Sequence, residues 1–153
     1  MAEYLATINW QRGDQAFIDN SYSRGHWWEF DGGLRVPASA SPHVVPLPMS
    51  VEYNIDPEEA FVASLSSCHM LFFLSIAGKR GFVVDSYTDN AIGIMEKDQS
   101  NRTSITRVTL TPHVVFSGTW PGAEELELIH EQAHETCFIA NSVKTEVSIK
   151  IVA

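Results

Sequence analysis

The sequence predicts an α+β protein, and three features support this. Short stretches of alternating apolar and polar residues near both ends are typical of strands, a long apolar segment at residues 56–77 predicts a buried helix, and an amphipathic segment at residues 123–137 predicts a second helix. The chain has 153 residues, 44% of them hydrophobic, which is enough for one core. We therefore expect a single domain over residues 1–153.

The N-terminal part is predicted to be β structure. Residues 4–10 alternate loosely enough for a first strand, and HWWEF before the Asp31-Gly32-Gly33 turn, with GLRVP after it, is typical of a hairpin. Residues 37–48, PASASPHVVPLP, are rich in proline and small residues, which disfavour a helix or a central strand. We expect a long surface loop there.

The central helix has recognisable ends. Asp56 is a good N-cap, Pro57 suits the first helical position, and Glu59 completes an acidic capping pattern. Gly78 and two basic residues predict the end near residue 77. The segment is long enough to raise the question of a membrane span, but polar side chains interrupt it at Ser64, Ser66, Ser67, His69 and Ser75. We expect a central helix that is covered on all sides.

Two strands and a closing strand are predicted after this helix. Residues 82–95 and 104–116 flank the polar tip KDQSN, and the second segment keeps its apolar residues at even positions across Pro112, which indicates an edge position or a bulge. The apolar face of the 123–137 helix is formed by Leu126, Ile129, His130, Ala133 and Cys137. Strict alternation over residues 143–151 predicts a half-buried final strand.

Composition limits the possible partners and the cellular compartment. A formal net charge of -9 leaves no basic patch for nucleic acid or anionic membranes. The N-terminus has no basic region followed by an apolar core, so we expect no secretory signal and a cytoplasmic protein. The two cysteines, Cys68 and Cys137, are too few for a disulfide scaffold, and in a reducing compartment such cysteines are reactive, metal-bound or simply buried.

One segment matches a zinc-protease pattern. HEQAH, from His130 to His134, has the H-E-x-x-H spacing in which two helical histidines bind zinc. The extension that supplies a third ligand is absent, since Ala140 stands where the third histidine belongs. A zinc-binding protein using His130, His134 and Cys137 remains an alternative to a core-facing His130 and a half-exposed His134.

The opening of the central helix resembles a known family. DPEEAFVASLSSC, from Asp56 to Cys68, is similar to the N/D-P-E-E/Q-L-x-x-A-x-x-x-C segment of the OsmC/Ohr family of peroxide-detoxifying proteins. The spacing of the two cysteines, the C-x-x-x-N-S segment at residues 137–142 and the order of elements agree as well. The resemblance implies an OsmC-like fold, in which antiparallel sheets wrap around long central helices in an intertwined homodimer.

The resemblance also implies a thiol peroxidase that reduces organic hydroperoxides. Cys68 would become a sulfenic acid and Cys137 would resolve it as a Cys68–Cys137 disulfide. Arg24, with Arg35 as the alternative, and Glu58 would polarise the site. The family needs no metal or organic cofactor, and its implied reductant is a dithiol, of the lipoyl type or similar.

Elementary chemistry agrees with these residue types. Burial raises the pKa of a thiol, so Cys68 needs a fixed cation beside it, and an arginine cannot lose its proton. A carboxylate then holds the guanidinium by paired hydrogen bonds. The aromatic side chains predicted to favour an organic peroxide, or alternatively to serve only as core packing, are Trp27, Trp28, Phe72 and Phe73.

Helix geometry predicts that the site is shared between two chains. Ten residues of a helix span about 15 Å, so Glu58 cannot touch Cys68 of its own chain. We expect Glu58 to come from a second subunit whose central helix lies antiparallel alongside.

Two positions depart from the family pattern. Phe138 stands where a proline usually follows the second cysteine, and His69 stands where an apolar residue is common. His69 either tunes the thiolate or makes a hydrogen bond in the core. A family member that has become a ligand-binding or redox-sensor protein without turnover is therefore the alternative function.

Overall fold

The computed structural model describes residues 1–152. The chain divides into two compact units, residues 1–60 and residues 61–153, which we describe separately. Within the described residues it forms eight strands, two α-helices and one short 3-10 helix, so the predicted α+β class is confirmed. The assignment of residues 1–153 to one domain stays a prediction.

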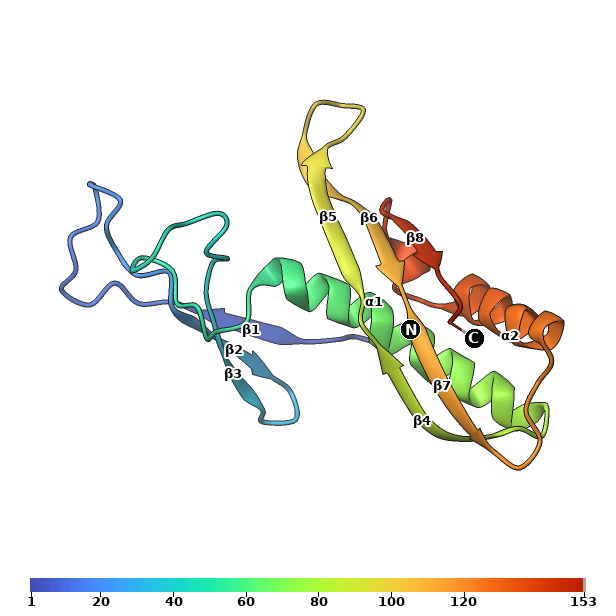
Figure 1. Cartoon of the computed structure of the whole chain (residues 1–153). Coiled ribbons are helices and arrows are strands. Elements are labelled where there is room, and N and C mark those ends of the chain that lie inside the picture. The colour runs from blue at the N-terminus through green and yellow to red at the C-terminus, as the bar shows by residue number, and fades with distance from the viewer. Residues whose placement is uncertain (153) are drawn as a thin grey trace. The chain divides into compact units, whose positions relative to one another are not determined.

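The first unit contains a three-stranded antiparallel sheet, coloured blue in Figure 1. Its strands are β1 (Ala6–Asn9), β2 (His26–Phe30) and β3 (Arg35–Ala38). The predicted hairpin joins β2 to β3, and its turn uses Gly33 at a φ of 93°, a conformation that glycine adopts at little cost. The predicted loop is wrong at its beginning, because β3 continues to Ala38 before the loop starts.

Helix α1 (Pro57–Lys79) has a capped start and a defined end. The Asp56 carboxylate accepts a hydrogen bond from the Glu59 backbone N–H at 2.8 Å, and the Glu59 carboxylate accepts one from the Asp56 N–H at 2.7 Å, so the capping box is confirmed. The helix ends two residues later than predicted. Gly81, at a φ of 86°, terminates it, because the N–H of Phe82 reaches the Ala77 carbonyl at 3.0 Å in a Schellman arrangement.

Only one stripe of α1 is buried by the rest of its own chain. The buried residues follow one another four positions apart and are Leu65, His69, Phe73 and Ala77. Leu71, on another face, is 60% exposed. The expectation of a helix covered on all sides is therefore wrong for the single chain. Among the described residues α1 is also the one helix long and apolar enough to cross a membrane, although core helices of soluble proteins meet the same test.

The second unit contains a broken β hairpin, most of α1, α2 and a final strand, as Figure 1 shows. Each of the two predicted long strands is divided in two. Strand β4 (Val83–Asp89) pairs with β7 (Pro112–Ser117), and β5 (Ile92–Lys97) pairs with β6 (Thr103–Leu110), all antiparallel.

The break occurs beside Pro112. Its neighbour Thr111 donates its backbone N–H to the Asp89 carboxylate at 2.6 Å, so a side chain replaces the sheet partner at this point. Pro112 is the first residue of β7, where a missing N–H costs no ladder bond. Strand β7 pairs only with β4 in a two-stranded sheet, so Pro112 stands on an edge strand, which confirms the edge position of the two expected alternatives. The bulges lie elsewhere, between residues 84 and 86 and between residues 94 and 95.

The final strand corrects the expectation that all sheets are antiparallel. Strand β8 (Glu146–Ile149) pairs with β6 in parallel. It follows helix α2 (Ala123–Thr136) and the short helix η1 (Ala140–Ser142), and a crossover through a helix returns the chain in the same direction.

The core of the second unit has two clusters, and the predicted apolar faces are confirmed in them. One cluster joins α1, β7 and α2 and contains Phe73, Ala77, Val114, Phe116, Ile129 and Ala133. The other joins α1 to β6 and contains Leu65, Val108 and Leu110. Strand β5 approaches α1 so closely that a Cβ added to Gly93 would lie 2.6 Å from a Val62 methyl group.

Candidate functional site

The two cysteine thiols meet inside the second unit. Cys68 lies in the middle of α1 and is half-buried, whereas Cys137 directly follows α2 and is buried. Both are free thiols. Burial raises the pKa of Cys137 to about 11, and a hydrogen bond with Cys68 contributes to the same shift. The Cys137 thiol is therefore neutral at physiological pH and lies near Cys68.

An antiparallel contact between α1 and α2 positions the thiols. We call this contact the α1–α2 seam, and its pairs are Cys68 with Cys137, Phe72 with Phe138, Phe73 with His130, and Arg80 with Glu125. Along α2 itself the partner changes from His130, opposite Phe73, to Glu125, opposite Arg80, so the two helices are antiparallel. The rings of Phe72 and Phe138 meet edge-on at 4.9 Å next to the thiols. Phe138 thus follows Cys137 directly and contacts Phe72, at the position where the family pattern has proline.

Arg24 is held firmly within the first unit. Its Nη1 donates to the backbone carbonyls of Asn20, at 3.1 Å, and Tyr22, and its Nη2 donates to the Asn20 side chain at 2.8 Å. The guanidinium also stacks 3.7 Å from the centre of the Tyr22 ring. No group in residues 1–152 accepts a hydrogen bond from Arg24 Nε. The Nε edge of a pre-oriented cation is thus available to a ligand.

Arg35 has a different environment. Its Nε donates to the Glu29 carboxylate at 3.1 Å across the β2–β3 hairpin, and its guanidinium stacks 3.9 Å from the Trp27 ring. The Arg35 side chain is 51% exposed. It is therefore a surface ion pair of the hairpin, and Arg24 is the better candidate of the two.

Glu58 has a buried carboxylate oxygen. It lies in the first turn of α1, and no residue from 1 to 152 donates a hydrogen bond to its Oε2. Within the same residues Glu58 and Arg24 form no ion pair. Buried carboxylate oxygens normally accept a hydrogen bond, and no residue from 1 to 152 donates one to Glu58 Oε2.

The histidines of the HEQAH segment form a cluster with His69. His69 Nε2 lies 3.0 Å from His130 Nδ1, and the two side chains are 1% and 2% exposed. The pKa of each is lowered to about 4, mainly by burial, with a smaller contribution from His134 at His69 and from His69 at His130. The prediction that His130 faces the core is confirmed, as is the half-buried state of His134. The sequence pattern indicated His69 as a core hydrogen-bonding residue but did not indicate its partner.

The same cluster argues against the zinc alternative. In the part of the chain that the structure describes, no three His, Cys, Asp or Glu side chains are arranged to hold a metal ion. His130 Nδ1 faces another imidazole, and Cys137 lies near Cys68. The three residues His130, His134 and Cys137 therefore do not form the predicted zinc set.

Each unit contains an open cavity. The first unit holds one of about 560 Å³, lined by Ile8, Trp10, Phe17, Tyr22, Arg24, His26, Ser39, Ala40, Val45 and Pro57. Its aromatic walls pack on one another, with Phe17 stacked 4.6 Å from Tyr22. This cavity combines apolar walls with the guanidinium of Arg24, which suits an amphipathic molecule.

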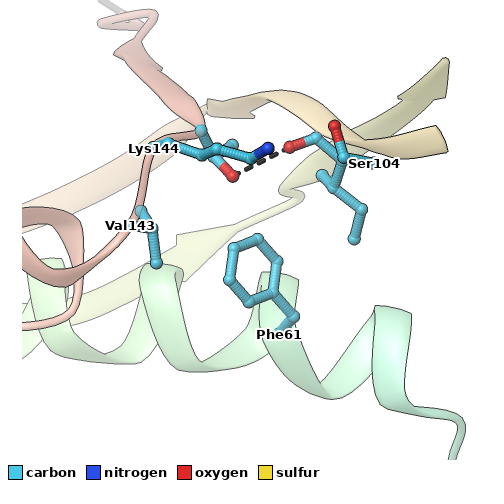
Figure 2. A pocket seen from close by; sticks show the side chains of 6 residues that line it. Phe61, Ser104, Val143 and Lys144 are labelled. Atoms are coloured by element: carbon cyan, nitrogen blue, oxygen red, sulfur yellow. Dashed lines mark hydrogen bonds between the residues drawn. The ribbon is translucent and has the colours of Figure 1, made fainter. Parts of the chain in front are cut away.

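The cavity of the second unit has no reactive group. It measures about 370 Å³ and lies between Phe61 of α1, the β6 residues Ser104 and Ile105, and residues 143–145. Figure 2 shows the Phe61 ring and the Val143 side chain in this space, with the hydrogen bond from the Thr145 hydroxyl to the Ile105 carbonyl beside them. Its cation, Lys144, is already paired with Asp98 at 2.9 Å. We therefore do not assign chemistry to it.

Comparison with known proteins identifies the family. Residues 52–152 match the family described as OsmC-like protein. The chain belongs to the OsmC-like family. A search of curated proteins gave no match.

Solved OsmC and Ohr structures share the fold. An OsmC-like protein of unknown function from Vibrio cholerae is 62% identical, with a TM-score of 0.97, over 99% of this chain and 100% of that one. An organic hydroperoxide resistance protein from Elizabethkingia anophelis, crystallised with thiocyanate, is 16% identical, with a TM-score of 0.71, over 99% and 94%. The organic hydroperoxide resistance protein OhrB of Bacillus subtilis is 17% identical, with a TM-score of 0.70, over 99% and 98%. The OsmC-like α+β fold is thus confirmed, with the parallel pairing of β6 and β8 as the exception to the expected antiparallel sheets.

Proposed function

We propose that this protein is a thiol-dependent peroxidase that reduces organic hydroperoxides. The observation that carries the proposal is the proximity of the free thiols of Cys68 and Cys137 across the α1–α2 seam. A half-buried thiol beside a buried one is the arrangement that a peroxidatic and a resolving cysteine require. Membership of the OsmC-like family, some of whose fold relatives are organic hydroperoxide resistance proteins, supports the same chemistry.

The proposed reaction has two steps. The Cys68 thiolate attacks the terminal oxygen of the hydroperoxide, so an S–O bond forms, the O–O bond breaks, and the alkoxide leaves and takes up a proton. The sulfenic acid of Cys68 then reacts with the Cys137 thiol, which gives the disulfide and water. A dithiol, of the lipoyl type or similar, reduces the disulfide and becomes a disulfide itself. We propose that this cycle takes place in the cytoplasm, where such dithiols are kept reduced.

Arg24 and Glu58 complete the proposed site. Arg24 presents its Nε edge, already oriented by Asn20 and Tyr22, to the thiolate and the peroxide. Glu58 offers a buried carboxylate oxygen to the guanidinium or the hydroperoxide proton. The aromatic cavity around Arg24 is the proposed binding place for the organic part of the substrate.

We propose that a homodimer assembles these residues. Helix length keeps Glu58 about 15 Å from Cys68 of the same chain, and α1 has an uncovered apolar face that includes Leu71. Sedimentation at micromolar concentration is expected to give a dimer. A Leu71→Glu variant places a charge on this face and is expected to shift the protein toward monomer and lower its turnover. A wild-type monomer with full peroxide turnover would contradict the composite site.

Intact-mass measurement tests the function directly. One equivalent of cumene hydroperoxide is expected to remove two hydrogens from the reduced protein, which is the signature of the disulfide, and a dithiol is expected to restore them. An unchanged mass would overturn the peroxidase proposal.

A redox sensor is the second candidate. It is favoured by one observation: burial raises the pKa of Cys137 to about 11, which makes this thiol a slow nucleophile. A sensor would form the same disulfide but would not turn over with excess dithiol and peroxide. Consumption of many equivalents of cumene hydroperoxide in the presence of dihydrolipoamide would decide for the enzyme.

A further inference from the structure

A pair of buried histidines crosses the α1–α2 seam beside the thiols. The rings of His69 and His130 are nearly coplanar, 3° apart, with His69 Nε2 at 3.0 Å from His130 Nδ1. The Phe73 ring packs 4.4 Å from His130 and helps to seal the pair from water. No residue in 1–152 bonds to His69 Nδ1 or His130 Nε2. Buried polar atoms without partners indicate a role other than plain packing.

The contact depends on the protonation state of the pair. When both imidazoles are neutral, one nitrogen donates and the other accepts, so the bond forms. A first added proton places an unpaired cationic N–H in the apolar core, and a second proton removes the acceptor and sets two positive charges side by side. The first proton therefore adds a buried charge but leaves the hydrogen bond in place, and the second proton breaks the contact.

The position of this pair relates it to the thiols. His69 follows Cys68 directly on α1. His130 lies seven residues, or two helical turns, before Cys137. Both pairs join the same two segments, so a change in the approach of α2 to α1 at the histidines also changes the approach of the two sulfurs.

We propose that the His69–His130 contact is a positioning latch that holds α2 against α1 so that Cys137 can reach oxidised Cys68, and that protonation of the pair releases it. This proposal rests on the proposed disulfide chemistry. Neither histidine touches the peroxide, so both act through the cysteines.

Other titratable groups face the latch and set its response. Burial lowers the pKa of His69 to about 4, His134 on α2 acts in the same direction, and Asp89 on β4 opposes both by favouring a charged His69. Tyr87 on β4 lies near Asp89 and keeps its proton, since burial raises its pKa. The cysteines on α1 and after α2 complete the set.

A double variant separates the hydrogen bond from the titration. A glutamine amide can take the position of the His69 Nε2 atom and an asparagine amide that of the His130 Nδ1 atom, so His69→Gln combined with His130→Asn keeps a hydrogen bond that cannot titrate. His69→Leu combined with His130→Leu keeps the volume but removes the bond. His113→Gln, at an exposed position on β7, is the matched control.

The experiment follows the second step of the reaction. Protein is mixed with one equivalent of cumene hydroperoxide between pH 4 and pH 8 and quenched with acid, and intact mass gives the fractions of sulfenic acid and disulfide over time. In the wild type and in His113→Gln we expect conversion of sulfenic acid to disulfide to slow below about pH 5. In the Gln/Asn variant we expect the rate at pH 7.5 to lie within about twofold of the wild-type rate. We also expect this variant to lack the slowing below about pH 5 that protonation of the histidine pair causes in the wild type. In the Leu/Leu variant we expect a rate about five- to tenfold lower at every pH, the equivalent of one lost hydrogen bond.

The outcomes distinguish this inference from the proposed function. If the wild type forms no disulfide, the proposed function fails, and the latch fails with it. If the disulfide forms but the Gln/Asn and Leu/Leu variants match the wild type in rate and pH profile, the latch alone is wrong. Should Leu/Leu fail to fold, the pH profile of Gln/Asn against wild type still decides, because an unchanged acid dependence in that variant contradicts the release step.

Discussion

The cysteine pair and the histidine pair cross the same α1–α2 seam, yet they differ in access to solvent. Cys68 is half-buried, so a small molecule can reach it, whereas His69 and His130 are 1% and 2% exposed. Reactive groups need access, and groups that hold two helices together need exclusion of water, because hydrogen bonds are stronger in a low dielectric. The difference supports the proposal that the cysteine pair carries the chemistry and that the histidine pair fixes its geometry.

The largest effects are expected at the cysteines. Cys68→Ser removes the attacking sulfur, so we expect peroxide consumption to fall at least about a thousandfold. Cys137→Ser leaves the first step intact, so we expect a single oxidation that adds one oxygen to Cys68, followed by no turnover with dithiol. Peroxide assays with intact-mass detection check both. If Cys68→Ser and Cys137→Ser both failed to react with the first equivalent of peroxide, the assignment of Cys68 as the attacking and Cys137 as the resolving cysteine would be wrong.

The next effect compares the two arginines. Arg24 is fixed by hydrogen bonds to Asn20 and Tyr22 with one edge open, while Arg35 is an exposed ion pair with Glu29. We expect Arg24→Met to lower kcat/KM for cumene hydroperoxide about a hundredfold, because it removes the cation that stabilises the thiolate and the leaving alkoxide. Arg35→Met is the matched control and is expected to stay within about twofold, since exposed ion pairs contribute little. A larger loss in Arg35→Met would reverse the assignment.

Much of the fold could be predicted because its signals are local. The capping box at Asp56 and Glu59 and the alternating residues of β6 and β7 depend on nearby residues alone, and the structure contains them. The failures involve distant partners. The division of the long hairpin depends on Asp89 bonding to Thr111, and the parallel pairing of β8 with β6 depends on the path through α2. Neither of these long-range contacts can be predicted from the alternation of apolar and polar residues along the chain.

The candidate site shows the same division. The resemblance to the OsmC/Ohr family, carried by the spacing of Glu58 and Cys68 and by the second cysteine, predicted the two thiols that the structure brings together. The partner of His69 could not be found this way, since His130 is 61 positions away and its motif indicated zinc. The sequence did show that His69 is a polar residue in an otherwise apolar stripe of α1. Its role could not be predicted, because the role depends on which side chain of α2 faces it.

The smallest predicted effect concerns stability in acid, and it tests the sealed character of the histidine pair. Burial lowers the pKa of His69 and of His130 from 6.5 to about 4, so between these values the unfolded chain binds more protons than the folded one. The free energy of unfolding is therefore unaffected by the pair above about pH 6.5 and falls as the pH drops toward 4, by at most about 3 kcal/mol for each histidine.

Urea unfolding at several pH values measures this slope. The Gln/Asn variant lacks both titrating groups, so its stability is expected to fall less steeply between pH 6.5 and pH 4 than that of the wild type. His113→Gln, which removes an exposed histidine, is expected to retain the wild-type slope. Equal slopes in all three proteins would mean that the histidines titrate as they do in water. In that case the pair is not sealed, and the contrast with the accessible cysteine disappears.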